Sequence, residues 1–292
     1  MRHHSLSRES LGFLLGFVGV VIFAATLPVT RLALEGFSPW FITFGRAALA
    51  AIAASIGLVV ARQRLHDSDT GRIALAALFL VFGFPAFANI ALQTVPAAHG
   101  GVVLGILPLA TAVFAAIIAG ERPSGLFWFA SLAGAALVVA FALRNDAGGL
   151  ALGDIWLFCA AISASIGYVI SGGLSRRMAG WVVISRALVL ALPLSFAGSL
   201  LTWRPEFADA SLRAWAAFFY LGLGSMFAGF WFWNAGLALG GIARVGQVQL
   251  LQTFFTVFFA WTLLAEPIGA DTLIFAAGVS AFVWLGRKAR GA

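Results

Sequence analysis

The sequence predicts an all-α integral membrane protein with ten transmembrane helices, arranged as two inverted five-helix repeats with the N- and C-termini in the cytoplasm. Three observations lead to this fold class: an apolar composition, ten apolar stretches of membrane-spanning length, and an internal repeat that contains five of them. Hydrophobic residues make up 62% of the 292 residues, and charged residues only 10%. A soluble domain carries about 25% charged residues, so the surroundings of this chain are mostly lipid.

Ten segments have the length of about 20 apolar residues that crosses the hydrocarbon core of a bilayer. Charged residues, Pro or Gly separate them. The segments are 11–34, 38–60, 72–93, 97–119, 124–143, 152–174, 180–202, 213–238, 243–264 and 269–287.

Basic residues are distributed unevenly between the two sides of these spans. With the N-terminus inside, twelve Lys and Arg residues fall in cytoplasmic segments and four on the opposite side. Cytoplasmic loops are enriched in basic residues, so we expect a multi-pass protein of the bacterial inner membrane with both termini in the cytoplasm. The net charge of +7 therefore reflects topology. A nucleic-acid partner is not expected, because the Arg residues are dispersed among short loops.

The chain also matches itself at an offset of 145 residues. Between 78–121 and 223–266, twelve of 44 aligned residues are identical, and the polar pairs Asn89/Asn234 and Glu121/Glu266 are among them. Composition alone would give about four. The sequence therefore predicts a first five-helix repeat in 1–147 and a second in 148–292. Because five is odd, the second repeat enters the membrane from the opposite side, an architecture that secondary carriers use for alternating access.

Two short motifs accompany the repeat. Arg46 and Arg186 lie inside the second and seventh spans, and the fourth and ninth spans close with Glu121-Arg122-Pro123 and Glu266-Pro267. Together with two five-span repeats, these motifs resemble the EamA-type drug/metabolite transporters, and within them the aromatic amino-acid exporters of the YddG type. The resemblance covers essentially the whole chain. It implies a carrier with one central cavity lined by both halves, which exports amphiphilic small metabolites such as aromatic amino acids.

The clearest candidate for the cavity wall is a polar stripe on the ninth span. Gln249, Gln252, Thr253 and Thr256 are three, four and seven residues apart and share one helical face. Leu104 and Leu107 occupy the matching positions of the fourth span. An amide-bearing wall opposite an apolar wall suits a substrate with a polar head and an apolar body. The predicted substrate-binding residues are Gln249, Gln252, Asn89, Asn234, Tyr168, Trp231, Thr256 and His99.

Several of these residues also have a structural interpretation. Asn89 and Asn234 fit helix–helix hydrogen bonding as well as cavity lining. His99 fits a packed imidazole better than a proton relay, and Trp231 fits packing or a lipid-facing position better than ligand stacking. Arg46 and Arg186 either satisfy backbone carbonyls or attract a substrate carboxylate.

Gly and Pro residues inside the spans are candidate gate hinges, because Pro frees backbone groups and Gly permits bending. Close helix packing explains the glycines equally well. The candidate hinges are Gly100, Gly101, Gly105, Pro108, Pro28 and Pro85.

The sequence offers little for other classes of function. All acidic residues fall in loops or at span ends, which favours a facilitator over a carrier coupled to protons or sodium through a carboxylate in the membrane. Three of four histidines lie outside the spans, and no motif of an enzyme, metal site or cofactor site is found. A broad-specificity drug or metabolite efflux carrier and, less favoured, a channel are the alternatives. The oligomeric state stays open, and a monomer is compatible with the sequence.

Overall fold

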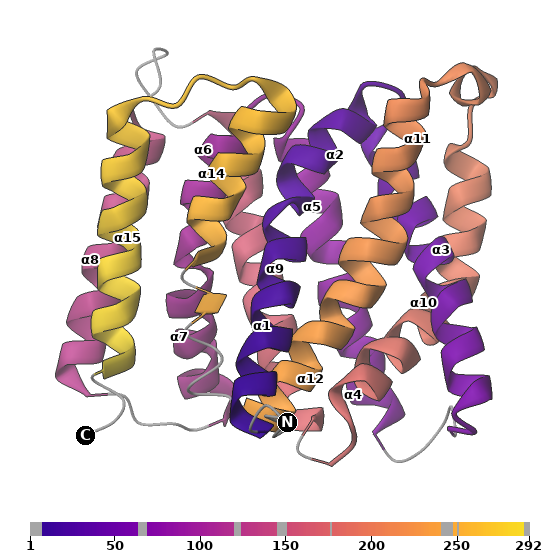
Figure 1. The fold of residues 1–292 in the computed structure, drawn as a ribbon, viewed down its shortest axis with the longest axis horizontal. Coiled ribbons are helices and arrows are strands. Elements are labelled where there is room, and N and C mark those ends of the chain that lie inside the picture. Colours follow the sequence, from indigo (N-terminus) through magenta and orange to yellow (C-terminus); the bar gives the residue numbers. More distant parts are fainter. Residues whose placement is uncertain are drawn as a thin grey trace, which may run out of the picture.

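The computed structural model describes residues 8–63, 69–119, 124–144, 151–175, 177–240, 248–249 and 251–288. Every regular element in these ranges is helical. The helices pack as one bundle with their long axes side by side, and α1 begins at the same end of the bundle at which α15 ends (Figure 1). Seven helical stretches are long and apolar enough to cross a membrane, and three shorter apolar helices accompany them.

The first half of the chain follows the predicted segments closely. α1 (Arg8–Ala24) and α2 (Thr26–Leu34) form one span with a break between them. The other elements are α3 (Pro39–Val60), α4 (Thr70–Ala77), η1 (Leu78–Gly83), α5 (Phe84–Ala91), α6 (Ala97–Val103), η2 (Leu104–Ile106), α7 (Leu107–Ala119) and α8 (Gly125–Ala142). The Glu121-Arg122-Pro123 motif lies outside the described residues.

The second half contains α9 (Leu152–Leu174), α10 (Gly180–Thr202), η3 (Pro205–Asp209), α11 (Leu212–Phe219), η4 (Tyr220–Gly229), α12 (Phe230–Gly240), α14 (Leu251–Leu264) and α15 (Ala270–Lys288). The predicted span 243–264 is described as a continuous helix only from Leu251. The remaining boundaries differ from the predicted ones by at most three residues.

Local sequence explains where several helices begin. The Ser38 hydroxyl accepts the N–H of Phe41, and Pro39 occupies the first turn of α3, which is the preferred arrangement for a helix N-terminus. Ser211 caps α11 in the same way through Ala214.

Four spans are interrupted near their middle. The first breaks at Ala25, three residues before Pro28, and the third contains the π-helix η1 just before Pro85. The fourth contains the short 3₁₀ segment η2, which includes Gly105, and the eighth contains the π-helix η4. Proline removes a backbone donor, and π-turns are common at functional sites. Three of the predicted hinge residues therefore lie at or beside breaks, whereas Gly100 and Gly101 lie inside α6 and Pro108 is the second residue of α7.

Structural features recur at positions that the repeat relates. η1 maps onto residues 223–228, which lie within η4. Asn89 donates to the carbonyl of Pro39 at the start of α3 (3.3 Å), and Asn234 donates to the carbonyl of Gly180 at the start of α10 (3.0 Å). The same hydrogen bond thus joins equivalent helices in each half of the chain.

The surface and core are those of a protein embedded in lipid. Large apolar side chains point outward from many helices, and Val59, Leu201 and Leu212 are among the most exposed. Buried residues form three apolar clusters. The largest joins α5, α6, α9, α14 and α15, and it surrounds one side of the cavity described next.

Candidate functional site

A cavity lies inside the bundle, between helices from both halves of the chain. Its wall is built from α1, α2, α3, η1, α5, α6, η2, α7, α9, η4, α12, α14, α15 and Gln249. Its volume, about 50 Å³, is well below the roughly 300–1,000 Å³ of pockets that enclose small ligands. The cavity as described is therefore narrower than a typical small-ligand pocket.

All four interrupted spans meet the cavity at their interruptions. Phe23 and Thr26 flank the break at Ala25, Leu80 belongs to η1, Gly105 to η2 and Ser225 to η4, and each of them lines the cavity. The irregular backbone is thus concentrated around this space, which is where non-helical backbone is tolerated at membrane depth.

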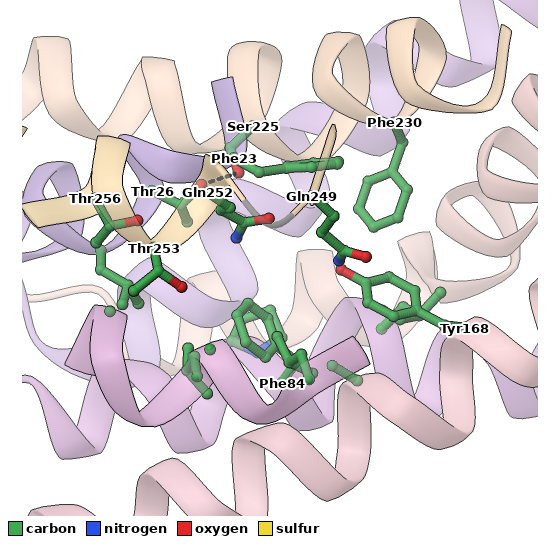
Figure 2. Close-up of a pocket in the computed structure, with 18 of the residues that line it drawn as sticks. Phe23, Thr26, Phe84, Tyr168, Ser225, Phe230, Gln249, Gln252, Thr253 and Thr256 are labelled. Atoms are coloured by element: carbon green, nitrogen blue, oxygen red, sulfur yellow. Dashed lines mark hydrogen bonds between the residues drawn. The ribbon is translucent and has the colours of Figure 1, made fainter. Parts of the chain in front are cut away.

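The polar stripe predicted on the ninth span lines the cavity. Gln249, Gln252, Thr253 and Thr256 all belong to its wall, and Figure 2 shows the Gln252 amide directed into it. Thr256 Oγ1 donates to the Ala24 carbonyl at 2.9 Å. That carbonyl lacks its usual helical donor, because the residue four positions later is Pro28. Thr256 therefore also satisfies the break in the first span.

The facing wall is apolar and closely packed, as the leucines of the fourth span predict. Leu104 and Leu107 line the cavity together with Gly101 and Gly105. A Cβ atom at Gly101 would lie 2.6 Å from Thr256 Cγ2, and one at Gly105 would lie 3.0 Å from Thr253 Oγ1. These glycines permit close contact between α6–η2 and α14, which is the packing role considered for them above.

Aromatic side chains close the remaining sides. Phe23, Phe84, Tyr168 and Phe230 line the cavity, and Figure 2 shows them on more than one side of the polar stripe. The rings of Phe23 and Phe230 are in edge contact at 4.9 Å between centroids. This arrangement offers ring faces and edges to an apolar or aromatic ligand body.

Polar side chains from the first and eighth spans complete the wall. Thr26 and Ser225 share a hydrogen bond of 2.8 Å, and Arg46 Nη2 donates to Ser225 Oγ at 3.3 Å. Arg46 itself lines the cavity. Sequence reasoning did not select Thr26, Ser225 or the ring of Phe84. The available signal was a hydroxyl inside an apolar span, which is too common in membrane helices to single out a cavity.

Four predicted substrate-binding residues lie outside the cavity. Asn89 donates to Thr43 Oγ1 (2.9 Å) and Pro39 O, and Asn234 donates to Gly180 O. Both residues join helices, and neither lines the cavity. Trp231 is 53% exposed on the outer surface of α12. Helix periodicity alone does not distinguish a face that lines a cavity from one that packs against a neighbouring helix or faces lipid.

His99 is the fourth, and it forms a buried hydrogen-bonded pair with Asp154. Its Nε2 lies 2.6 Å from Asp154 Oδ1, and Asp154 is completely buried (0% exposed). The ring of His99 stacks on Phe141 with 4.8 Å between centroids. Asp154 Oδ2 also accepts the N–H of Ala151 at the start of α9. The sequence places Asp154 near a span end, but the structure buries its carboxylate completely inside the bundle.

A second, larger pocket of about 930 Å³ opens at the end of the bundle away from the start of α1. The ends of α2, α5 and α14 and the start of α3 line it, and its charged residues are Arg31, Glu35, Arg204 and Glu266. We call this pocket the vestibule. Leu92 lines the vestibule, Leu27 and Leu104 line the cavity, and all three belong to one buried cluster. A layer of apolar side chains thus separates the two spaces.

The fold and the cavity define a class of protein: a polytopic membrane protein with a central, amphiphilic cavity lined by both halves of the chain. The chain belongs to the EamA-like transporter family, whose family model matches twice, over residues 10–143 and 151–285. It is therefore a transporter, and a multi-pass protein of the bacterial inner membrane.

Three relatives are similar to this chain in sequence, and one solved structure shares its fold. The chain is 43% identical over 266 residues to the uncharacterized transporter YdeK of Bacillus subtilis, covering 90% of this chain and 92% of that one. It is 28% identical to a probable terminal-alkyne amino-acid exporter of Streptantibioticus cattleyicolor (91% and 83% covered) and 25% identical to the aromatic amino acid exporter YddG of Ancylobacter novellus (91% and 93%). A crystal structure at 20% identity shares the fold with a TM-score of 0.65, covering 96% and 98% of the two chains.

Proposed function

We propose that this transporter exports amphiphilic small metabolites, aromatic amino acids foremost, by alternating access through the central cavity. The observation that carries the proposal is the composition of the wall: Gln249 and Gln252 face the same space as Phe84, Tyr168 and Phe230. Amides can hydrogen-bond a polar head group, and the rings can pack against an apolar or aromatic body. Two relatives are named as a probable terminal-alkyne amino-acid exporter and an aromatic amino acid exporter. These two side chains differ in shape, which agrees with an apolar part of the wall that is not shaped for one ring.

The proposal includes ten spans in two inverted repeats, 1–147 and 148–292, with both termini in the cytoplasm. α3 and α10 occupy equivalent places in the two repeats, and Gly198 near the end of α10 packs on Phe44 near the start of α3. The two helices therefore run antiparallel, as inversion requires. The excess of basic residues at the end of the bundle where α1 begins supports a cytoplasmic location for that end.

The small volume of the cavity agrees with an alternating-access cycle in which the cavity widens to admit substrate. The apolar layer separates the cavity from the vestibule, which on this topology opens to the outside. We propose that Gly100, Gly101, Gly105, Pro108, Pro28 and Pro85 supply the backbone adjustments that open and close this layer.

Transport of labelled amino acids into proteoliposomes tests the proposal. Saturable counterflow of L-phenylalanine or L-tryptophan without any ion gradient is expected, and Gln252→Ala should reduce it strongly. Ser199→Ala, on α10 outside the cavity, is the matched control. Strict dependence on a proton gradient would contradict facilitated transport, single-channel currents would contradict a carrier, and uptake of unrelated cationic drugs but no amino acid would favour a broad efflux carrier.

A further inference from the structure

The cavity wall contains two buried polar atoms whose hydrogen-bonding capacity is unused. Arg46 is 3% exposed, and its Nε has no hydrogen-bond partner in the described part of the chain. Gln252 Oε1 is likewise buried without a donor there. Buried polar groups are nearly always paired in folded proteins, because leaving them unpaired costs free energy. One donor and one acceptor left unpaired in the wall of one cavity therefore point to a ligand that supplies both partners.

Arg46 also has no ion-pair partner among the described residues. Within the described residues no Asp or Glu forms an ion pair with it, and no acidic side chain lines the cavity. The only side-chain acceptor for its guanidinium there is the Ser225 hydroxyl, which Thr26 holds in place. A buried cation without an anion is costly, and a carboxylate is the group that a guanidinium binds best.

The repeat-related arginine differs. Arg186 does not line the cavity, and its Nη1 faces Met178 Sδ at 3.8 Å. The cavity thus receives a cation from the first repeat and amides from the second, so a bound molecule meets different chemistry on its two sides.

We infer that the cavity recognises both charges of an α-amino acid, with the carboxylate bound at Arg46 and the ammonium group at the carbonyl oxygen of Gln252. This inference rests on the proposed function of the same cavity and deepens it. Arg46 then determines specificity: amphiphiles that carry only a positive charge meet an unpaired guanidinium and are rejected. The aromatic wall accepts the side chain with little selectivity, and the head group supplies most of the discrimination.

Competition between compounds that share the phenyl side chain but differ in the head group tests this inference. Proteoliposomes containing the full chain take up labelled L-phenylalanine in the presence of unlabelled L-phenylalanine, phenethylamine, which lacks the carboxylate, or 3-phenylpropionate, which lacks the amine. We expect L-phenylalanine to compete at least about tenfold better than phenethylamine, the ratio that one charge-assisted hydrogen bond provides. Arg46→Gln should reduce this ratio to nearly one, whereas Arg46→Lys should retain part of it. Gln252→Leu should instead reduce the preference over 3-phenylpropionate.

A ratio of inhibition constants does not depend on how much carrier is folded, so a lower yield of the Arg46 variants leaves the result interpretable. Where uptake is weak, the shift in melting temperature caused by each compound gives the same ratio. Arg186→Gln is the matched control and should keep the ratio of the parent chain. Equal competition by phenethylamine and L-phenylalanine in the parent chain, or an unchanged ratio in Arg46→Gln, would overturn the inference while leaving amino-acid transport intact. Absence of L-phenylalanine uptake would instead overturn the proposed function.

Discussion

Glu266 Oε1 lies 2.8 Å from the backbone nitrogen of Ala97 and so links the end of α14 to the start of α6. The other carboxylate oxygen accepts the N–H of Ala98, also at 2.8 Å. The first N–H groups of a helix lack partners within the helix, and a carboxylate is favourable at that end. The two halves of the chain are thereby joined at the wall of the vestibule, next to the apolar layer above the cavity.

Replacing this carboxylate should loosen the closed arrangement. Glu266→Gln keeps the shape of the side chain but leaves a neutral amide, with only one oxygen acceptor for two N–H groups. We expect the contact between α14 and α6 to lose about 1–2 kcal/mol of stabilisation. The measurement is labelling of Leu104→Cys in a Cys159→Ser background with a membrane-impermeant maleimide added from outside, which should become about fivefold faster or more. Glu206→Gln, an exposed acid on η3, is the control. Equal labelling rates in the two variants would show that Glu266 does not hold the vestibule side closed.

Replacing Ala265, the residue before Glu266, with glycine should increase the stability of the protein. Ala265 has φ of 54°, a left-handed conformation that costs an L-residue about 1–2 kcal/mol. Ala265→Gly removes that cost but adds conformational entropy to the unfolded chain. We expect a net gain of about 0.5–1 kcal/mol, visible as a higher melting temperature of the purified protein. A lower melting temperature would mean that this methyl group makes contacts that matter more than the backbone conformation. Ala265→Val should be destabilising in the same assay.

The close approach of Gly101 to Thr256 predicts a steric coupling between α6 and α14. Gly101→Ala places a methyl group 2.6 Å from Thr256 Cγ2, and overpacking of this kind costs about 1–3 kcal/mol. Thr256→Ser removes Cγ2 but keeps the hydroxyl, so it should partly restore the stability of Gly101→Ala. Gly172→Ala, where nothing lies within 4 Å, should be neutral. If the double variant were as unstable as Gly101→Ala, the contact with Thr256 Cγ2 would not be the cause of that instability.

The buried pair of His99 and Asp154 predicts a non-additive effect on stability. Asp154→Ala removes the acceptor of both His99 and the Ala151 N–H, and each buried group left without its hydrogen-bond partner costs about 1–3 kcal/mol. His99→Ala/Asp154→Ala leaves the Ala151 N–H without its acceptor but no imidazole without its carboxylate, so it should cost clearly less than the sum of the two single changes. Thermal unfolding of the four proteins in one detergent gives the comparison. Strict additivity would contradict a direct energetic coupling.

Spans and site were predictable from the sequence to different degrees. Hydropathy located helix boundaries to within a few residues, since the length of an apolar run is a direct signal of a membrane helix. The stripe from Gln249 to Thr256 was found because its residues share one face of one helix. Arg46, Ser225 and Thr26 come together from three spans, and no periodicity within a single span indicates such a meeting. Asn234 and Trp231 were selected for their polarity and aromaticity, yet neither lines the cavity. Such side chains mark a position as unusual, but only packing decides which neighbour the position faces.

The four interrupted spans give the cavity a mechanical property. Three of the helices that line the cavity region or pack beside it are continuous: α3, α9 and α10. The irregular turns at Ala25, η1, η2 and η4 all line the same small cavity. A molecule that fills this space would contact the interruptions of all four spans, three in the first half of the chain and one in the second. Such a molecule would contact both halves of the chain at the same time. A smaller molecule would leave some of the four interruptions without a contact.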